Sequence, residues 1–347
     1  MERPPDHLPE LTPRLLEGLD GLLVTHPANL RYLSGFPHGE DAWLWLDAKG
    51  PLLLASPLYE NDLEALGLPH RLGRPRDWPH LLAERARGRV GFEPEHLAYG
   101  DYQRLLEAFK GAELVPAGGR VEALRLKKRP DEVEKIRRAM AIARDAYREA
   151  LPEVRPGVSE IQVAAALECA MRRRGAEGRA FPTIVASGEN GAFPHAGASE
   201  KPLREGELVT LDFGARYQGY HSDVTRTLAL GEVSPELSRI LRAVQAALAA
   251  ALERVGPGRP IAEADRAARA VLEAEGLLRC YPHALGHGVG LEVHEAPRIS
   301  HQSEGVFEPG MVVTIEPGVY VPGLGGARVE ELVLITEDGA LILSGDL

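Results

Sequence analysis

Cysteine is scarce in this chain of 347 residues, which contains only Cys169 and Cys280. Two cysteines cannot build a disulfide framework or a cysteine-rich zinc site. Scarce cysteine therefore favours a reduced, intracellular setting, and we expect a cytoplasmic protein.

Long apolar runs and an excess of basic charge are also lacking. The sequence has no uncharged apolar run of about 18 residues, the length that spans a membrane, and residues 1–7 lack the features of a secretory signal. Lys and Arg number 40 against 51 Asp and Glu, a formal net charge of −11. Nucleic acids and anionic membranes bind concentrated basic surfaces. We therefore expect neither nucleic-acid nor membrane binding.

The composition is that of a globular protein, with 44% hydrophobic and 26% charged residues, and the length favours two domains. In residues 1–121, short apolar runs alternate with turn residues. The pattern predicts strands at 21–25, 43–46 and 51–55 and a helix at 102–109. We expect a small α/β domain in residues 1–121.

A basic segment that ends in proline follows, and we interpret residues 122–130 as a linker. A helix is expected from Asp131, which has the spacing of a capping box with Glu134. Further helices are expected at 159–174, 234–255 and 261–275, and strands at 208–213, 221–230, 312–316 and 330–335. Because helices and strands come in separate groups, residues 131–347 are predicted to form an α+β domain.

The strongest signal for chemistry is a pair of aspartates on two adjacent predicted strands, Asp212 and Asp223. A hairpin centred between Tyr217 and Gln218 would place them opposite one another, with Cβ atoms roughly 4.5 to 5.5 Å apart. Carboxylates that close repel unless a positive charge lies between them. Alternatively, each aspartate only marks a strand end that faces solvent.

Two glutamates repeat this arrangement near the C-terminus. Glu316 and Glu330 are symmetric about Gly323, at the centre of a glycine-rich loop. Pro317 cannot donate a hydrogen bond to a β-ladder, so Glu316 is expected at a strand end or an irregularity. The two glutamates are therefore predicted to meet across a second hairpin.

A histidine flanked by glycines, His287, lies between the two hairpins. Imidazole is a common ligand of first-row transition metals, although a single histidine in a strand is more often structural. Four acids that converge on His287 favour the metal ligand. A His-Glu-x-x-His motif is absent, because His294-Glu295 is followed by Ala-Pro-Arg, and no phosphate-binding loop or nucleophile elbow occurs.

A site built from these residues would hold four formal negative charges, too many for a partly buried pocket without cations. Two divalent ions and a bridging hydroxide would bring the total to about −1 and form a hydrolytic centre. Mn, Co, Fe and Zn all suit these ligand types. The five candidate ligands are Asp212, Asp223, His287, Glu316 and Glu330.

With these segments, the chain resembles the pita-bread metallopeptidases, specifically the Xaa-Pro dipeptidases (prolidases) and Xaa-Pro aminopeptidases. The resemblance covers nearly the whole length and rests on the order Asp, Asp, His, Glu, Glu. Residues 186–195 resemble the family's substrate-pocket histidine segment, and residues 24–35 its N-terminal domain signature. The resemblance implies a creatinase/prolidase-like N-terminal domain and a creatinase/aminopeptidase-like pita-bread domain.

The resemblance also implies roles for the metal ligands. Asp223 and Glu330 would bridge two metal ions, and Asp212 would complete the coordination of one of them. His287 and Glu316 would complete the coordination of the other, and Glu316 would also shuttle the proton of the bridging water.

Three further residues would act on the substrate or order the site. By the same resemblance, His195 and His294 would position the substrate and stabilise the tetrahedral intermediate. Arg328 would help to order the site.

The implied activity is hydrolysis of the bond before proline in a small peptide with proline at the second position, by a homodimer. That bond is a tertiary amide without an N–H, and its leaving amine must be protonated. A methionine aminopeptidase, which usually lacks an extra N-terminal domain, and a non-catalytic pita-bread binding protein are the alternatives. The compact length favours a dipeptidase over an aminopeptidase, but the choice depends on how the pocket is closed.

Overall fold

The computed structural model describes residues 8–345 and 347, and the chain divides into two compact units, Met1–Arg125 and Leu126–Leu347. The division falls within the segment 122–130, where the short helix α6 (Glu122–Arg125) is followed by α7 (Pro130–Ala150). Among the described residues, no helix has the length and apolar character needed to cross a membrane.

The first unit is built on one mixed sheet with the strand order β4-β3-β2-β1-β5-β6. Its strands are β1 (Gly21–Val24), β2 (Ala42–Asp47), β3 (Leu52–Ala55), β4 (His70–Leu72), β5 (Gly88–Phe92) and β6 (Ala112–Pro116). Its other helices are α1 (Leu8–Leu15), α2 (Pro27–Ser34), α3 (Glu60–Leu66), α4 (Trp78–Leu82) and α5 (Tyr99–Ala108). These elements confirm the three strands and the helix predicted from the sequence.

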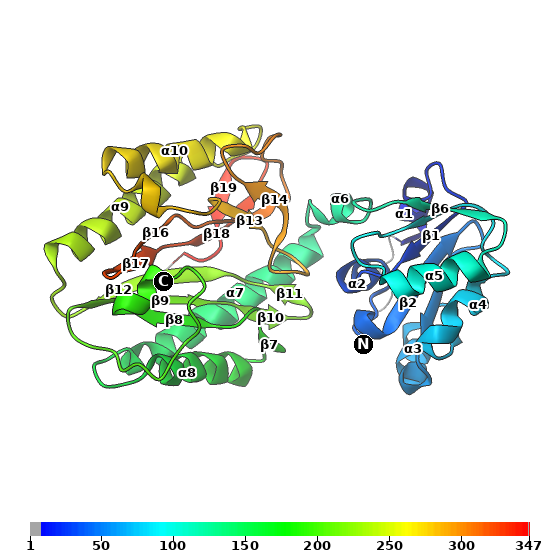
Figure 1. The fold of residues 1–347 in the computed structure, drawn as a ribbon, viewed down its shortest axis with the longest axis horizontal. Helices are drawn as coiled ribbons and strands as arrows, with labels where there is room; N and C mark the ends of the chain where they lie inside the picture. The colour runs from blue at the N-terminus through cyan, green and yellow to red at the C-terminus, as the bar shows by residue number, and fades with distance from the viewer. Residues whose placement is uncertain (1–7, 346) are drawn as a thin grey trace. The chain divides into compact units, whose positions relative to one another are not determined.

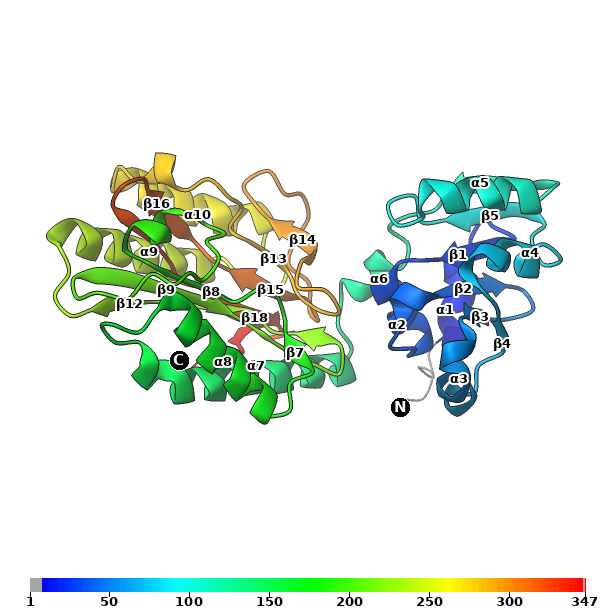
Figure 2. The ribbon, with the colours of Figure 1, turned by 60° about the horizontal axis from the view of Figure 1, so that its bottom comes forward.

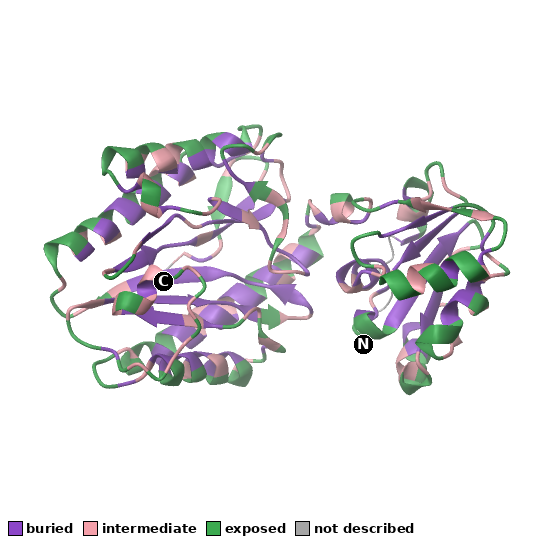
Figure 3. Cartoon of the chain, in the orientation of Figure 1, coloured by how far each residue is buried: buried purple, intermediate pink, exposed green. Residues whose placement is uncertain are grey.

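The centre of this sheet is apolar on both faces, as a strand covered on both sides requires. Every residue of β2 is buried, and Trp45 is fully enclosed. Gly21 on the neighbouring strand makes room for this ring, because a Cβ at Gly21 would lie 2.5 Å from a ring carbon of Trp45. The buried strands and the exposed outer sides of the helices are visible in Figure 3.

The second unit places strands between two pairs of helices. Figures 1 and 2 show α7 and α8 (Glu160–Arg173) on one side of the strands, with α9 (Pro235–Leu252) and α10 (Ile261–Ala274) on the other. These bounds confirm the helices predicted at 159–174, 234–255 and 261–275.

The strands of this unit form several small sheets, with the orders β12-β9-β8, β14-β13-β15-β18-β19, β11-β10-β7 and β16-β17. The first strands are β7 (Gly178–Arg179), β8 (Ile184–Ser187), β9 (Glu207–Phe213), β10 (Ala215–Tyr217), β11 (Tyr220–His221) and β12 (Val224–Leu230). The later ones are β13 (Gly286–Gly288), β14 (Glu295–Ile299), β15 (Val312–Ile315), β16 (Gly318–Val321), β17 (Gly325–Arg328), β18 (Glu331–Ile335) and β19 (Ala340–Ile342). A small α/β unit followed by an α+β unit confirms the predicted fold class.

The start of α7 differs from the prediction. The helix begins at Pro130, and the side chain that folds back on its N-terminus is that of Glu132, whose Oε2 accepts a hydrogen bond from Arg129 N at 2.9 Å. The predicted capping box of Asp131 with Glu134 is therefore wrong. Proline fits the first helical position because its missing N–H has no partner there in any case.

Candidate metal centre

Asp212 lies on β9 and Asp223 directly before the neighbouring strand β12, and their predicted register is wrong. Asp212 on β9 pairs with Thr225 on β12, because the hairpin turn is centred between Gln218 and Gly219. These two residues have φ values of 48° and 79°, the left-handed geometry of a tight two-residue hairpin turn. Asp223 therefore precedes β12 and lies diagonal to Asp212 instead of opposite it.

The two glutamates have the predicted register. Ile315 on β15 pairs with Glu331 on β18, and Gly318 on β16 pairs with Arg328 on β17. Both ladders extrapolate to a pairing of Glu316 with Glu330, which confirms the symmetry expected from the sequence. The glutamates occupy the break between the two ladders, where their side chains are free to turn toward the aspartates.

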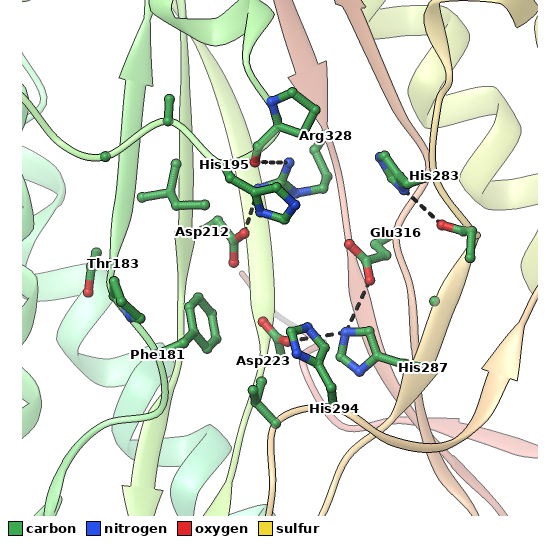
Figure 4. Close-up of a pocket in the computed structure, with 18 of the residues that line it drawn as sticks. Phe181, Thr183, His195, Asp212, Asp223, His283, His287, His294, Glu316 and Arg328 are labelled. Atoms are coloured by element: carbon green, nitrogen blue, oxygen red, sulfur yellow. Dashed lines mark hydrogen bonds and ion pairs between the residues drawn. The ribbon is translucent and has the colours of Figure 1, made fainter. Parts of the chain in front are cut away.

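The carboxylates converge although they come from four segments of the chain. One oxygen each from Asp212, Asp223 and Glu330 lies within 4.8 Å of the other two. His287, on β13, places its Nε2 3.2 Å from Glu316 Oε1 and 3.7 Å from Asp223 Oδ2. Figure 4 shows the two aspartates, His287 and Glu316 pointing toward one another. The geometry therefore brings together the five residues expected to meet.

Two oxygens of this cluster are buried without a hydrogen-bond partner in the described chain, Asp212 Oδ1 and Glu330 Oε1. Burial, together with the neighbouring carboxylates, raises the pKa of Asp223 and of Glu330 well above their ordinary values. Burial also raises the pKa of Asp212, although Arg328 opposes the shift. A cation bound between these carboxylates would compensate the cost of burying acceptors without donors. The donor set of carboxylates and an imidazole therefore fits divalent transition metals.

Glu316 and His287 form a charged pair at the edge of this cluster. Burial opposes ionisation of both groups, but their hydrogen bond and the nearby opposite charges together outweigh it, lowering the pKa of Glu316 to about 2 and raising the pKa of His287. A protonated His287 carries an N–H on both ring nitrogens, including Nε2, the nitrogen nearest the two carboxylates. A metal ion would compete with that proton for the same lone pair.

Arg328 is the buried cation of the site, with 4% of its surface exposed. One of its terminal nitrogens donates to Asp212 Oδ2, and the other donates to the Tyr320 hydroxyl at 2.6 Å and to Pro194 O at 3.1 Å. Its Nε lies 3.3 Å from Thr225 Oγ1. Arg328 thus orients one carboxylate of the cluster and links it to the segment that carries His195.

A pocket of about 560 Å³ opens onto the cluster. His195 and His294 line it with the carboxylates, and the His294 ring centroid lies 4.3 Å from that of His287. Apolar side chains form part of its wall as well, including Phe181, Ile184 and Val293, and Figure 4 shows Phe181 on the side of the two aspartates. The pocket therefore combines acidic and apolar lining residues.

His283 also lines the pocket, and sequence analysis assigned it no role. Its Nε2 lies 3.0 Å from the Tyr320 hydroxyl, and burial lowers its pKa. The one sequence signal that could have pointed to His283 is its position four residues before His287. That spacing suggests a metal motif only on a helix, whereas here β13 begins between the two histidines.

A second group of ligand-type residues lies in the first unit. Within the described residues, His26, His96 and Glu122 form the other set whose ligand atoms are within 4.8 Å of one another. This set has a single carboxylate, Glu122, and a guanidinium nitrogen of Arg125 lies 3.5 Å from His26 Nδ1. The cluster around Asp223 combines four carboxylates with a histidine and is therefore the stronger candidate for a metal centre.

Comparison with known proteins agrees over most of the chain. The model of metallopeptidase family M24 matches residues 134–337, and that of the creatinase/prolidase N-terminal domain matches residues 16–127. A Pyrococcus furiosus protein named Xaa-Pro dipeptidase is 38% identical, over 93% of this chain and 92% of its own length.

Solved structures agree with the sequence matches. The structure of an Xaa-Pro dipeptidase from Bacillus anthracis is 36% identical with a TM-score of 0.91, covering 99% of this chain and 97% of that one. The structure of an X-Pro aminopeptidase from Thermotoga maritima is 32% identical with a TM-score of 0.87, covering 96% and 97%. The similar structures thus include proteins of both names.

Proposed function

Since the chain belongs to metallopeptidase family M24, we propose that this enzyme hydrolyses the peptide bond before proline in small peptides, using two divalent metal ions. The observation that carries the proposal is the convergence of buried carboxylates, two of whose oxygens, Asp212 Oδ1 and Glu330 Oε1, lack a hydrogen-bond donor among the described residues. The names of the similar proteins, Xaa-Pro dipeptidase and X-Pro aminopeptidase, support the choice of substrate.

We assign the metal ions to the converging residues. Asp223 and Glu330 would bridge the two ions, with Asp212 on one of them and His287 and Glu316 on the other. When bound, the ions would acidify a water molecule and polarise the scissile carbonyl group. Mn, Co, Fe and Zn remain the candidates, because each accepts this mixture of oxygen and nitrogen ligands.

Glu316 is the proposed proton carrier. Its carboxylate lies at the pocket wall and would be ionised beside divalent cations at neutral pH, so it can accept a proton from attacking water. The proline nitrogen leaves as a secondary amine and must gain a proton as the bond breaks. Glu316 would deliver the proton to this nitrogen.

The pocket histidines are proposed to act on the substrate. Burial lowers the pKa of His294, so its imidazole is neutral at neutral pH and can donate one N–H to a developing oxyanion. His195 lines the same pocket and would help to position the peptide. Arg328 would act through Asp212, which it orients by a hydrogen bond.

The apolar wall of the pocket suits the ring of proline. Phe181, Ile184 and Val293 offer carbon surface with no hydrogen-bond donor to satisfy. A tertiary amide has no N–H to donate, so an apolar wall leaves no hydrogen-bond donor of this amide unsatisfied.

A dipeptidase that works as a cytoplasmic homodimer is the form of the proposal that we favour.

Hydrolysis of three peptides tests the proposal. The full chain, supplied with Mn²⁺ or Co²⁺, is expected to cleave an Xaa-Pro dipeptide and to leave a Met-Ala peptide without proline largely intact. Cleavage of an Xaa-Pro-Yaa tripeptide in preference to the dipeptide would instead identify an aminopeptidase. Efficient cleavage of the Met-Ala peptide would favour a methionine aminopeptidase, and metal binding without hydrolysis of any peptide would favour a binding protein.

A further inference from the structure

We propose that Glu160 is a positioning residue that holds His195 in the pocket, an inference that rests on the proposed peptidase function. Glu160 is the first residue of α8, is fully buried, and does not line the pocket. It acts through residues 187–199, here called the His195 segment. This segment leaves β8, forms the short 3-10 helix η5 (Gly188–Ala192) and carries His195 into the pocket.

Glu160 binds the His195 segment at both ends. Its Oε1 accepts hydrogen bonds from Ser187 N and Ser187 Oγ, both at 2.8 Å. Its Oε2 accepts from Ser199 N at 3.2 Å and from Ser199 Oγ at 2.6 Å. The side-chain amide of Asn190, inside the segment, donates to both oxygens at 3.1 and 3.0 Å. One carboxylate therefore joins both ends of the loop and its middle, and the hydrogen bond from Asn190 Nδ2 to Ser199 Oγ at 3.3 Å adds to this link.

The other side of the His195 segment faces the metal centre. Gly191 packs against β17 so closely that a Cβ at Gly326 would lie 2.3 Å from Gly191 O. Arg328, on the same strand, donates to Pro194 O at 3.1 Å and also to Asp212. The segment is thus held by Glu160 and, directly before His195, by Arg328. Figure 4 shows Arg328 beside His195.

A carboxylate is needed because Ser187, Asn190 and Ser199 all donate hydrogen bonds to Glu160. An ionised glutamate only accepts hydrogen bonds, whereas glutamine would turn an NH₂ group toward donors of Ser187 or Ser199. Lys201 reinforces this direction, because its Nζ donates to Ser187 Oγ at 2.8 Å. The Ser187 hydroxyl therefore directs its own proton to Glu160. Replacement by glutamine keeps the shape of the side chain and breaks the arrangement of donors and acceptors.

The first test is Glu160→Gln in the full chain, loaded with Mn²⁺ and assayed with an Xaa-Pro dipeptide. We expect kcat/KM to fall by about 10²-fold, the cost of a misplacement of about 1 Å. The metal content should equal that of the unsubstituted chain, because Glu160 contacts none of the metal candidates. Unchanged kcat/KM, or loss of metal, would overturn the proposal.

Glu93→Gln is the matched control, because Glu93 is a buried carboxylate of the first unit that also accepts backbone and amide N–H groups. It should lower the melting temperature and leave kcat/KM of the folded protein unchanged. Glu160→Asp, which keeps an acceptor-only group, should recover part of the lost activity. An equal loss of kcat/KM in the control and in Glu160→Gln would mean that Glu160 has only a structural role.

A double-mutant cycle identifies the residue through which Glu160 acts. If Glu160 positions His195, Glu160→Gln should cost much less in a chain that already carries His195→Ala. Additive effects of the two substitutions would contradict the assignment.

Amide hydrogen exchange supplies a measurement that does not depend on activity. Glu160→Gln should speed exchange in residues 187–199 and leave α9 and α10 unchanged, whether or not the peptide is cleaved. If the unsubstituted chain cleaves no Xaa-Pro peptide, the proposed function fails. If it cleaves the peptide but exchange in residues 187–199 is unaffected by the substitution, only the inference about Glu160 fails.

Discussion

Two buried glutamates, one in each unit of this protein, have opposite surroundings. In the first unit, Glu93 is 2% exposed and accepts hydrogen bonds from the backbone of Thr25 and His26 and from the side chain of Asn29. In the second unit, Glu330 is 1% exposed, and its Oε1 has no partner among the described residues. Similar burial thus occurs with a full set of donors in one place and an incomplete set in the other.

The difference separates carboxylates that stabilise the fold through hydrogen bonds from carboxylates that a bound cation would stabilise. Asp47 in the first unit receives hydrogen bonds from Arg85, Trp45 and the backbone of Lys49, and together these outweigh the effect of burial and lower its pKa. Burial and like charges instead raise the pKa of Asp223. A buried charge without compensation costs free energy. A bound cation would remove this cost, so we expect cation binding to stabilise the folded chain.

The largest expected effect comes from removing a shared carboxylate of the cluster. Asp223→Asn should lower kcat/KM by about a thousandfold or more, because metal polarisation is worth several kcal/mol and each 1.4 kcal/mol is about tenfold in rate. Metal content, measured by elemental analysis after dialysis, should also fall. Full activity with unchanged metal content would refute the bridging role of Asp223.

A smaller effect is expected from a pocket residue outside the cluster of ligands. His294→Ala should lower kcat by about 10²-fold, as expected for loss of one hydrogen-bond donor to an oxyanion. Metal content should not change, because the carboxylates and His287 are untouched. Loss of metal in this variant would show that His294 is a ligand and that its proposed role is wrong.

The pH dependence of stability should differ in sign between the two regions. In a chelator, the raised pKa of Asp223 stabilises the folded chain below pH 3.8, its ordinary pKa, and this contribution is lost as pH rises through the raised value. Asp223→Asn cannot ionise, so its melting temperature should exceed that of the unsubstituted chain by a few degrees at neutral pH.

Thermal unfolding at several pH values, with and without Mn²⁺, measures this difference. Added Mn²⁺ should reverse the order of the two melting temperatures, because only the unsubstituted cluster binds the ion well. A lower melting temperature of Asp223→Asn in chelator at neutral pH would show that the cluster is not repulsive.

The smallest effect on activity is expected in the first unit. Asp47→Asn should destabilise the chain by about 1–3 kcal/mol, because Arg85 then lacks its buried partner. The lowered pKa of Asp47 means that this cost is present above pH 3.8 and shrinks as pH falls through the lowered value. Urea unfolding should show this loss while kcat/KM of the folded protein stays unchanged. A large loss of kcat/KM would break the distinction between the two regions.

Much of the fold was predictable because its signals are local. The helix expected at 159–174 begins with Ser159 and with Gln162 three residues on, and the structure shows both hydrogen bonds of a capping box between them. The pairing of Glu316 with Glu330 was predictable for the same reason, since the glycine-rich loop between them is symmetric about Gly323. The first hairpin was displaced because its centre depends on which residue adopts a left-handed φ, and Gln218 is not a residue type that marks such a turn.

The role proposed for Glu160 could not be predicted in this way. Its partners Ser187 and Ser199 lie 27 and 39 residues further along the chain, and no spacing rule connects them. In the sequence, Glu160 is simply an acidic residue in the first turn of a helix, where such residues are common and usually exposed.

The sequence alone determined the element types, the order of the two units and the residue types available for a metal centre, because periodicity, turn residues and ligand chemistry act over short stretches of chain. Tertiary structure decided which acids lack donors, which cation orients Asp212, and which face of α8 holds the His195 segment. These features depend on distances between segments far apart in the chain. Burial and charge compensation are set only when those segments pack together.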